Sequence, residues 1–396
     1  MIRRRTRGSH FAAAIAFTAA APWSLIQDAN AKDSEQHRPN ILLIMTDQQH
    51  AGMLGCAGNP YLKTPALDRL AAAGTRFELA HAANPVCVPS RFSLQTGRMP
   101  STIGMRTNEV QLAVPPELCT QSLGPLLRQA GYRCVYGGKD HTPRDPSKYM
   151  MTNGYELLAH DPRDGLASAC ANFIRNPHDR PFFLFASFIN PHDICYMAIN
   201  DFARSQGRPI MSNQDSRVCE SVLDQARRSG DLDAFVREHC PPLPDNFAVP
   251  RDEPESIGLD YARPDSFRHY AREHWSEQTW RLHRWLYCRL TEQVDAQIGS
   301  VLQALDEAGL QDNTLVVFTS DHGDMDAAHR LEHKSVLYDE SVRIPLLVAW
   351  KGVLPAGRVD TKHLASNGLD LLPTLCDFAG VSPPADLPGP LQVQRV

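Results

Sequence analysis

Short apolar runs alternate with amphipathic stretches along most of this chain, and this alternation constrains its fold more than any other feature. Residues 41–45, 182–188 and 315–318 form almost uninterrupted apolar runs, as expected of strands that are buried on both faces. Residues 280–308 instead carry apolar side chains at helical spacing. Strands that alternate with helices predict an α/β fold with a large, mostly parallel sheet flanked by helices.

Shorter segments extend the pattern. Thr64 and Pro65 are typical of a helix start, and Gly74 of its end. Similar signals predict helices at 122–130 and 369–378 and strands at 75–82, 133–136 and 346–348. Residues 197–266 differ, because Pro and charged residues are frequent there and no period holds for long. We interpret this segment as an inserted excursion over the binding edge of the sheet, where substrate selectivity usually resides.

The N-terminus has the layout of a signal peptide. A cationic start with four arginines precedes an apolar stretch at 11–21, and Ala29-Asn30-Ala31 has the small-x-small form of a cleavage site. We therefore expect residues 1–31 to be removed and the protein to be periplasmic or secreted. The apolar stretch is too short for a stable membrane span. The remaining chain is predicted to comprise a main domain at 32–389 and a short tail at 390–396.

Charge and cysteine usage exclude some functions. The formal net charge is −5, and no basic stripe suggests a nucleic-acid partner. Removal of the arginine-rich start would make the chain still more acidic. The ten cysteines show no C-x-x-C spacing of the kind that binds zinc. An exported chain could pair some of them, and the sequence leaves that pairing open.

Polar side chains follow several of the predicted strands at the point where each strand ends. Asp47, Lys139, His192 and Asp321 occupy such positions. Open α/β sheets bind their ligands at the edge formed by the carboxyl ends of the strands. We therefore expect these four residues to share one site.

The most informative segment is Cys87-Val88-Pro89-Ser90-Arg91, which Thr96-Gly97-Arg98 follows. Pro89 suits the first turn of a helix, so Cys87 would lie at the helix N-terminus. Backbone N–H groups favour negative charge there, and the pattern therefore predicts a thiol of lowered pKa.

This segment resembles the signature of the sulfatase family, C-x-P-S-R followed by T-G-R. The family is the formylglycine-dependent branch of the alkaline phosphatase superfamily. The similarity extends from about residue 38 to about residue 389, with several blocks in the same order. It implies an alkaline-phosphatase-like fold and hydrolysis of sulfate monoesters. It also implies that Cys87 is converted to formylglycine by a formylglycine-generating enzyme.

The resemblance implies a divalent cation and its ligands. Asp47 and Gln48 resemble the first pair of metal ligands, Asp321 and His322 resemble the second, and the nucleophile made from Cys87 completes the set. Two carboxylates and an amide oxygen suit Ca²⁺ or Mg²⁺. The His322 nitrogen leaves Mn²⁺ or Zn²⁺ open. The resemblance itself favours Ca²⁺.

The resemblance also assigns catalytic roles. Arg91 looks like the residue that steadies the formylglycine. Lys139 and His141 resemble a G-K-x-H block that contacts the nucleophile and the sulfate, and Lys334 resembles a second sulfate-binding lysine. A dication and two ammonium groups would offset the charge of the reacting ester. His192 resembles a leaving-group contact and is our candidate general acid, with His141 as the candidate base.

Two other interpretations remain open at this point. The first is hydrolysis of phosphodiesters or phosphonate monoesters, because that reaction needs the same charge-neutralising site. The second is a truncated, non-catalytic relative. Few residues follow Gly389, so the smaller C-terminal subdomain that the resemblance implies is expected to be missing. An apolar flank would then be exposed and would favour oligomers. The expected substrate is a sulfated small molecule or saccharide, whose identity the sequence does not specify.

Overall fold

The computed structural model describes residues 38–108, 114–145, 148–149 and 154–387. The predicted signal peptide (1–31) and tail (390–396) lie outside the described residues. So do all the residues that follow Leu387, and the expectation of a missing subdomain therefore stays a prediction. From Pro39 onward the described residues form one compact unit.

Three fully buried strands form the centre of an eight-stranded sheet. β1 (Asn40–Asp47) lies between β8 (Phe182–Pro191) and β9 (Thr314–Ser320) and runs parallel to both. Ile44 is paired with Ala186 on one side and Phe318 on the other. These strands are apolar along their length because both faces of the sheet are covered. The predicted α/β fold with a mostly parallel sheet is confirmed.

The strand order of the sheet is β11-β2-β10-β9-β1-β8-β4-β7. β10 is antiparallel to both of its neighbours, and the other pairings are parallel. The outer strands are β4 (Arg133–Gly138), β7 (Glu156–Ala159), β10 (Leu346–Ala349), β2 (Thr75–Phe77) and β11 (Arg358–Asp360). Two short pairs stand apart: β3 (Ala80–His81) with β12 (Ala365–Ser366), and β5 (Arg144–Asp145) with β6 (Lys148–Tyr149). The predicted strand at 75–82 is thus two strands, because its second half pairs with β12 instead of the large sheet.

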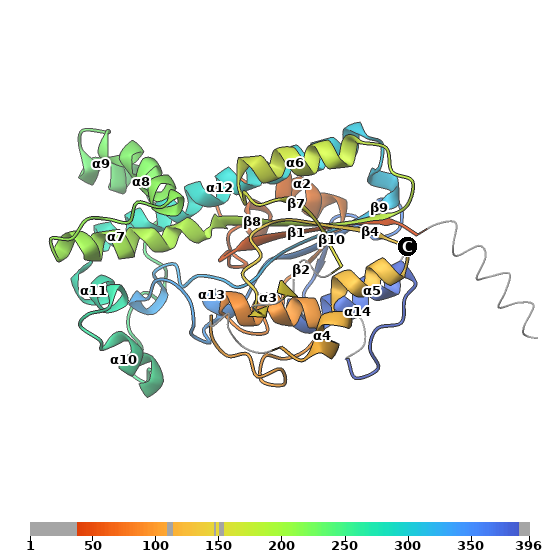
Figure 1. Cartoon of the computed structure of the whole chain (residues 1–396). Coiled ribbons are helices and arrows are strands. Elements are labelled where there is room, and N and C mark those ends of the chain that lie inside the picture. Colours follow the sequence, from red (N-terminus) through yellow and green to blue (C-terminus); the bar gives the residue numbers. More distant parts are fainter. Residues whose placement is uncertain (1–37, 109–113, 146–147, 150–153, 388–396) are drawn as a thin grey trace, which may run out of the picture. The chain divides into compact units, whose positions relative to one another are not determined.

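Helices cover both faces of the sheet (Figure 1). One face packs against α2 (Pro65–Ala73), α6 (Asp164–Arg175) and the C-terminal half of α12 (Glu277–Glu307). The other packs against α3 (Cys87–Thr96), α5 (Leu123–Gln129) and α14 (Asn367–Ala379). α4 (Pro116–Thr120) and α13 (Asp339–Val342) are short, as are four 3₁₀ turns, Gly55–Ala57, His192–Ile194, Gln311–Asn313 and Ala328–Arg330.

The segment at 197–266, which shows no lasting period in the sequence, is largely helical. Its helices are α7 (Cys195–Ser205), α8 (Gln214–Arg227), α9 (Leu232–His239) and α10 (Glu255–Tyr261), followed by α11 (Phe267–His274). Asn213, Asp231 and Ser266 cap three of them by accepting a backbone N–H. The apolar residues of α7, α8, α9 and α11 form a separate cluster against the N-terminal half of α12, and those of α10 belong to another small cluster. The short helices present few apolar residues each, which is why the period is hard to read.

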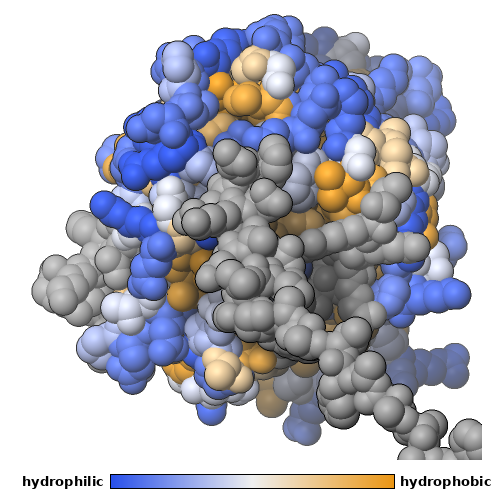
Figure 2. Space-filling view, turned by 90° about the vertical axis from the view of Figure 1, so that its right-hand side faces the viewer, coloured by the Kyte–Doolittle hydropathy of each residue, from blue (hydrophilic) through white to orange (hydrophobic). Residues whose placement is uncertain are grey.

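The carboxyl ends of the parallel strands point toward these helices, at the left in Figure 1. The opposite end of the sheet, where β1 begins, is shown in Figure 2. Apart from what the grey atoms cover, hydrophobic residues appear there as small areas within a mostly hydrophilic surface.

Candidate active site

The carboxyl ends of β1 and β9 meet the first residue of α3. Asp47 ends β1, Asp321 and His322 follow β9, and Cys87 begins α3. One donor atom from each of these four residues lies within 4.8 Å of the others, and all four are buried. Sγ of Cys87 lies 3.2 Å from Nε2 of His322 and 3.9 Å from Oδ1 of Asp47. The structure therefore gathers residues that are up to 275 positions apart in the sequence into one cluster.

Arg91 lies one turn along α3 from Cys87 and connects the two aspartates. Its Nε donates to Oδ2 of Asp321 at 2.7 Å, and one terminal nitrogen donates to Oδ2 of Asp47 at 2.8 Å. The other terminal nitrogen donates to the carbonyl of Lys139 and the hydroxyl of Ser187. The guanidinium is fully buried, and the ion pairs with the aspartates raise its pKa against the effect of burial. Arg91 therefore fixes the geometry of both carboxylates.

Two lysines approach the cluster from different directions. Nζ of Lys139, just beyond β4, lies 2.6 Å from Oδ2 of Asp47. Nζ of Lys334, from the loop that follows β9, lies 3.1 Å from Sγ of Cys87 and 2.8 Å from Oε1 of Gln48. Together with Arg91 they place three cations around two carboxylates and one thiol. The site therefore suits an anionic ligand.

The local charges shift the pKa values of the cluster. Burial alone would raise the pKa of Asp47, but Lys139, His192 and Arg91 keep it well below its usual range. Burial and Asp47 would raise the pKa of the Cys87 thiol, and Lys334, Lys139 and His322 instead keep it well below its usual range. This agrees with the low-pKa thiol predicted from the position of Cys87 at a helix N-terminus.

The residues present suit a divalent cation. Nδ1 of His322 lies 2.9 Å from the carbonyl of Gly323, which accepts its proton in that tautomer and leaves the lone pair of Nε2 facing the cluster. Asp47 uses Oδ2 for Arg91 and Lys139, so Oδ1 faces Cys87 and His322. Two carboxylates, an imidazole and the side chain at position 87 form a donor set for a metal ion.

Gln48 contacts the cluster differently. Its backbone N–H donates to Oδ1 of Asp321, and its side-chain amide donates to Asp324 at 2.7 Å. The amide oxygen accepts from Lys334 and from the thiol of Cys195 at 3.1 Å. This oxygen is therefore directed to the lysine, and its role as a metal ligand stays a prediction.

His141 and His192 border a cavity of about 760 Å³ beside the cluster. Lys139 and Asp140 lie on the same wall, and Asp215 reaches it from α8. Nδ1 of each histidine is buried and has no hydrogen-bond partner among the described residues. Unpartnered buried ring nitrogens beside a cavity indicate that a ligand completes their hydrogen bonds.

Several site residues escaped the sequence analysis. Ser187 accepts from Arg91, Asp324 orients Gln48, and Cys195 lies 3.0 Å from Nδ1 of His333. Asp324 lies two residues after His322, so its position next to the predicted metal ligands Asp321 and His322 was a usable signal. Ser187 lies within an apolar strand, where a single polar residue marks no function without the fold.

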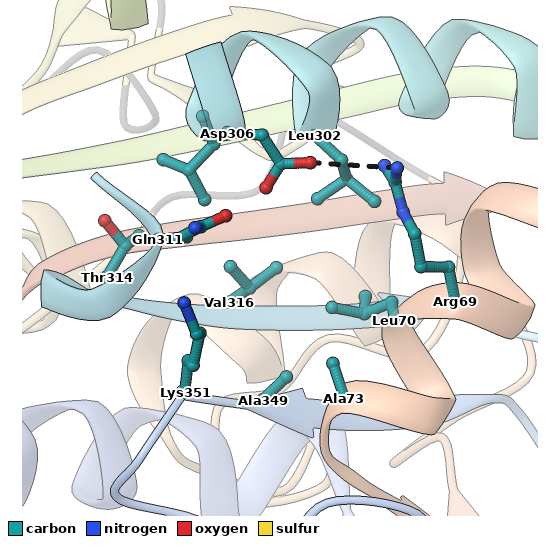
Figure 3. A pocket seen from close by; sticks show the side chains of 11 residues that line it. Arg69, Leu70, Ala73, Leu302, Asp306, Gln311, Thr314, Val316, Ala349 and Lys351 are labelled. Atoms are coloured by element: carbon teal, nitrogen blue, oxygen red, sulfur yellow. Dashed lines mark ion pairs between the residues drawn. The ribbon is translucent and has the colours of Figure 1, made fainter. Parts of the chain in front are cut away.

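A second cavity, of about 290 Å³, lies at the other end of the strands (Figure 3). Its floor is formed by apolar side chains such as Leu70, Leu302 and Val316. The ion pair at its rim, between Arg69 and Asp306, spans 3.7 Å and is exposed to solvent. No nucleophile or metal-ligand cluster of the described residues borders it, so it is not the candidate site.

An α/β sheet with a buried cysteine, two lysines and a possible metal-binding cluster at its carboxyl edge is consistent with a hydrolase of the alkaline phosphatase superfamily. The model of the sulfatase family matches residues 39–381, and the chain therefore belongs to the sulfatase family, a class of sulfate ester hydrolases. The sequence-based assignment to this family is confirmed.

Individual relatives agree with this. The chain is 30% identical over 373 residues to a Δ4,5-hexuronate-2-O-sulfatase of Bacteroides thetaiotaomicron, covering 89% of this chain and 71% of that protein. It is 30% identical to an ulvan-active sulfatase of Formosa agariphila, covering 90% and 65%. The solved structure of a 2-O GAG sulfatase matches with a TM-score of 0.69 and 28% identity, over 89% of this chain and 73% of that one. The chain thus spans about two thirds to three quarters of the length of these relatives.

The remaining expectations concern cysteines and membranes. All ten cysteines lie within the described residues, and none of them forms a disulfide. Among the described helices, none combines the length and apolar character that a bilayer crossing requires.

Proposed function

We propose that this protein is an exported sulfatase that hydrolyses sulfate monoesters of saccharides, with a formylglycine made from Cys87 and one divalent cation. The observation that carries this proposal is the contact between the Cys87 thiol and Lys334, within one buried cluster that also holds Asp47, Asp321 and His322. A cysteine used only for packing would not need a buried ammonium group 3.1 Å away.

Asp47, Asp321, His322 and the side chain at position 87 would hold the cation, with Ca²⁺ as the first candidate and Mg²⁺ or Mn²⁺ as alternatives. When bound, the cation and the hydrated aldehyde supply a hydroxyl nucleophile and charge stabilisation at the sulfate. Arg91 holds Asp47 and Asp321 in the geometry that ligation requires.

Lys139 and Lys334 bind the sulfate oxygens in this proposal. Lys334 is buried beside the proposed nucleophile and the Lys139 side chain is 12% exposed, so little water screens either ammonium group. Their charge offsets the negative charge that the ester carries into the reaction.

His192 and His141 move protons. Both border the cavity that receives the alcohol portion of the substrate. Burial, Lys139 and Lys334 hold the pKa of His192 well below its usual range, although Asp47 opposes them. Such a histidine, once protonated, gives up its proton readily, which suits protonation of the leaving oxygen. His141 is assigned the role of general base. It removes the proton whose loss lets the sulfate leave, so that the enzyme is ready for the next turnover.

The saccharide substrate and the export are supported from outside the site. The names of the two relatives given above describe sulfatases that act on a hexuronate and on ulvan. An N-acetylglucosamine-6-O-sulfatase of Bacteroides thetaiotaomicron is 26% identical to this chain. Export rests on the signal-peptide layout of residues 1–31. A formylglycine-generating enzyme is then required as a partner during maturation.

The decisive experiment expresses the chain together with a formylglycine-generating enzyme. Peptide mass spectrometry should find an aldehyde at position 87, and the purified protein should release sulfate from an aryl sulfate faster than it cleaves the matched aryl phosphodiester. Cys87→Ala should remain folded and lose turnover. Full activity with an unmodified Cys87 thiol would refute the formylglycine, and faster phosphodiester cleavage would refute the proposed preference for sulfate esters.

A further inference from the structure

The cavity beside His192 has an acidic wall that the proposed mechanism does not use. Asp215, in the first turn of α8, borders this cavity together with Asp140. A ring nitrogen of His192 and one oxygen each of Asp193 and Asp215 lie within 4.8 Å of one another. Asp215 therefore stands close to the histidine that would contact the leaving oxygen of the ester.

Arg163 fixes the position of Asp215. One terminal nitrogen of Arg163 donates to Oδ1 of Asp215 at 2.7 Å and to both oxygens of Asp193 at 2.8 Å. Arg163 is 8% exposed and Asp193 is fully buried, whereas the side chain of Asp215 is 25% exposed. A buried arginine, itself paired with the buried Asp193, thus holds a carboxylate that still reaches the cavity.

The charge of this cavity is uneven. Lys139 is the one lysine or arginine among its described lining residues, and Asp47 at 2.6 Å engages it at the sulfate end. Arg163 is a single cation shared between the carboxylates of Asp193 and Asp215, so it does not offset the negative charge of both. Carboxylates accept hydrogen bonds from hydroxyl and amino groups and repel a second anionic group.

We propose that Asp215 is a specificity-determining residue that selects a neutral or cationic alcohol portion over an anionic one. It accepts a hydrogen bond from a hydroxyl or amino group next to the sulfated position. The preferred substrate is accordingly a sulfated neutral or amino sugar, and a sulfated uronate is disfavoured. This inference rests on the proposed sulfatase function, since it names the substrate class of the same site. This substrate preference would differ from that of the relative whose name describes action on a hexuronate.

The test uses three aryl sulfates that differ only in one ring substituent, which is aminomethyl, hydroxymethyl or carboxylate. The quantity compared for each is the ratio of kcat/KM between the wild type and Asp215→Asn, because this ratio cancels the intrinsic reactivity of the leaving group. We expect Asp215→Asn to lower kcat/KM about tenfold for the cationic compound, to change it least for the neutral compound and to raise it severalfold for the anionic one. Asp215→Glu, which keeps the charge, should retain the wild-type order.

The matched control is Asp224→Asn. Asp224 lies on the same helix, pairs with Arg227, has a side chain 44% exposed and does not line the cavity. This variant should leave all three ratios near one. If Asp215→Asn changes the three substrates equally, Asp215 serves only to stabilise the start of α8, and the proposal is overturned.

Binding measurements distinguish a failure of this inference from a failure of the proposed function. The same three compounds are titrated into Cys87→Ala and into Cys87→Ala combined with Asp215→Asn, neither of which turns over. A charge order in the dissociation constants that depends on Asp215 supports the inference even if the wild type hydrolyses none of the three. Hydrolysis of all three without such an order supports the sulfatase and refutes the role of Asp215.

Discussion

The ammonium nitrogen of Lys334 lies 3.1 Å from the sulfur of Cys87, although 247 positions separate the two residues in the sequence. Both side chains are buried, and Oε1 of Gln48 accepts a second hydrogen bond from the same nitrogen at 2.8 Å. A buried ammonium group is costly without partners, so its position marks where negative charge is stabilised. The proposed nucleophile, made from Cys87, therefore lies beside a fixed cation.

Replacement of this cation should reduce turnover far more than stability. We expect Lys334→Met to lower kcat by about 10² to 10³, the effect of losing one preorganised donor at a developing charge. Steady-state kinetics on an aryl sulfate measures this, and circular dichroism checks the fold. Lys351→Met is the control, because Lys351 is 61% exposed and pairs only at the surface with Asp312. Equal kinetics for the two variants would contradict the assigned role.

Metal content should depend on Asp321. Its Oδ2 accepts from Arg91, and its Oδ1 accepts from the backbone N–H groups of Gln48 and His322. Asp321→Asn keeps the size of the side chain but removes the charge that a cation requires. We expect the bound metal, measured by inductively coupled plasma mass spectrometry, to fall to background together with activity. Asp312→Asn, at an exposed site, should keep its metal. A fully metallated Asp321→Asn protein would show that the ligand cluster is misassigned.

The effect of removing His192 should depend on the leaving group. Protonation of the leaving oxygen matters most when the alcohol is a poor leaving group and little when it is a nitrophenol. His192→Ala should therefore lower kcat/KM for a sulfated sugar by about 10² or more, but only severalfold for 4-nitrophenyl sulfate. The ratio of the two losses is the measured quantity. Equal losses on both substrates would instead indicate a role in binding or packing.

Glu332 gives a stability prediction with a defined pH dependence. Its side chain is 1% exposed, and neither carboxyl oxygen has a hydrogen-bond partner among the described residues. Burial raises the pKa of Glu332 to about 8, with Arg268 acting in the opposite direction. The folded protein therefore prefers the protonated form. Its contribution to stability is complete below the unfolded pKa, near 4.3, and is lost as the pH rises through about 8.

Glu332→Gln should remove this dependence, because an amide does not ionise. The melting temperature of the wild type should fall relative to that of the variant between pH 5 and pH 9, by about 2–4 °C for each 1 kcal/mol lost. Differential scanning calorimetry across that range measures the difference. Glu273→Gln, at an exposed position of α11, should run parallel to the wild type. Parallel curves for Glu332→Gln as well would mean that Glu332 is ionised in the folded protein.

Local patterns in the sequence were sufficient for much of the fold. The apolar run at 41–45 predicted the central strand, because a strand covered on both faces has no solvent side on which to place polar residues. Pro65 and Gly74 located α2 nearly to the residue, since a first-turn proline and a following glycine are local signals. The helices at 195–274 were not predicted, because each has few apolar residues, and these can be recognised as core residues only in the packed structure.

The sequence by itself determined the family, the position of Cys87 at a helix start and the residues to be considered at the strand ends. These properties depend on short spacings within single segments, and such spacings are present in the sequence itself. Only the tertiary structure decided which partner each residue meets. It bound Arg91 to two aspartates and directed the Gln48 amide to Lys334. It also brought Asp215, which pairs with Arg163, close to His192. Such contacts join segments far apart in the chain, and they are set by how strands and helices pack, which no local pattern records.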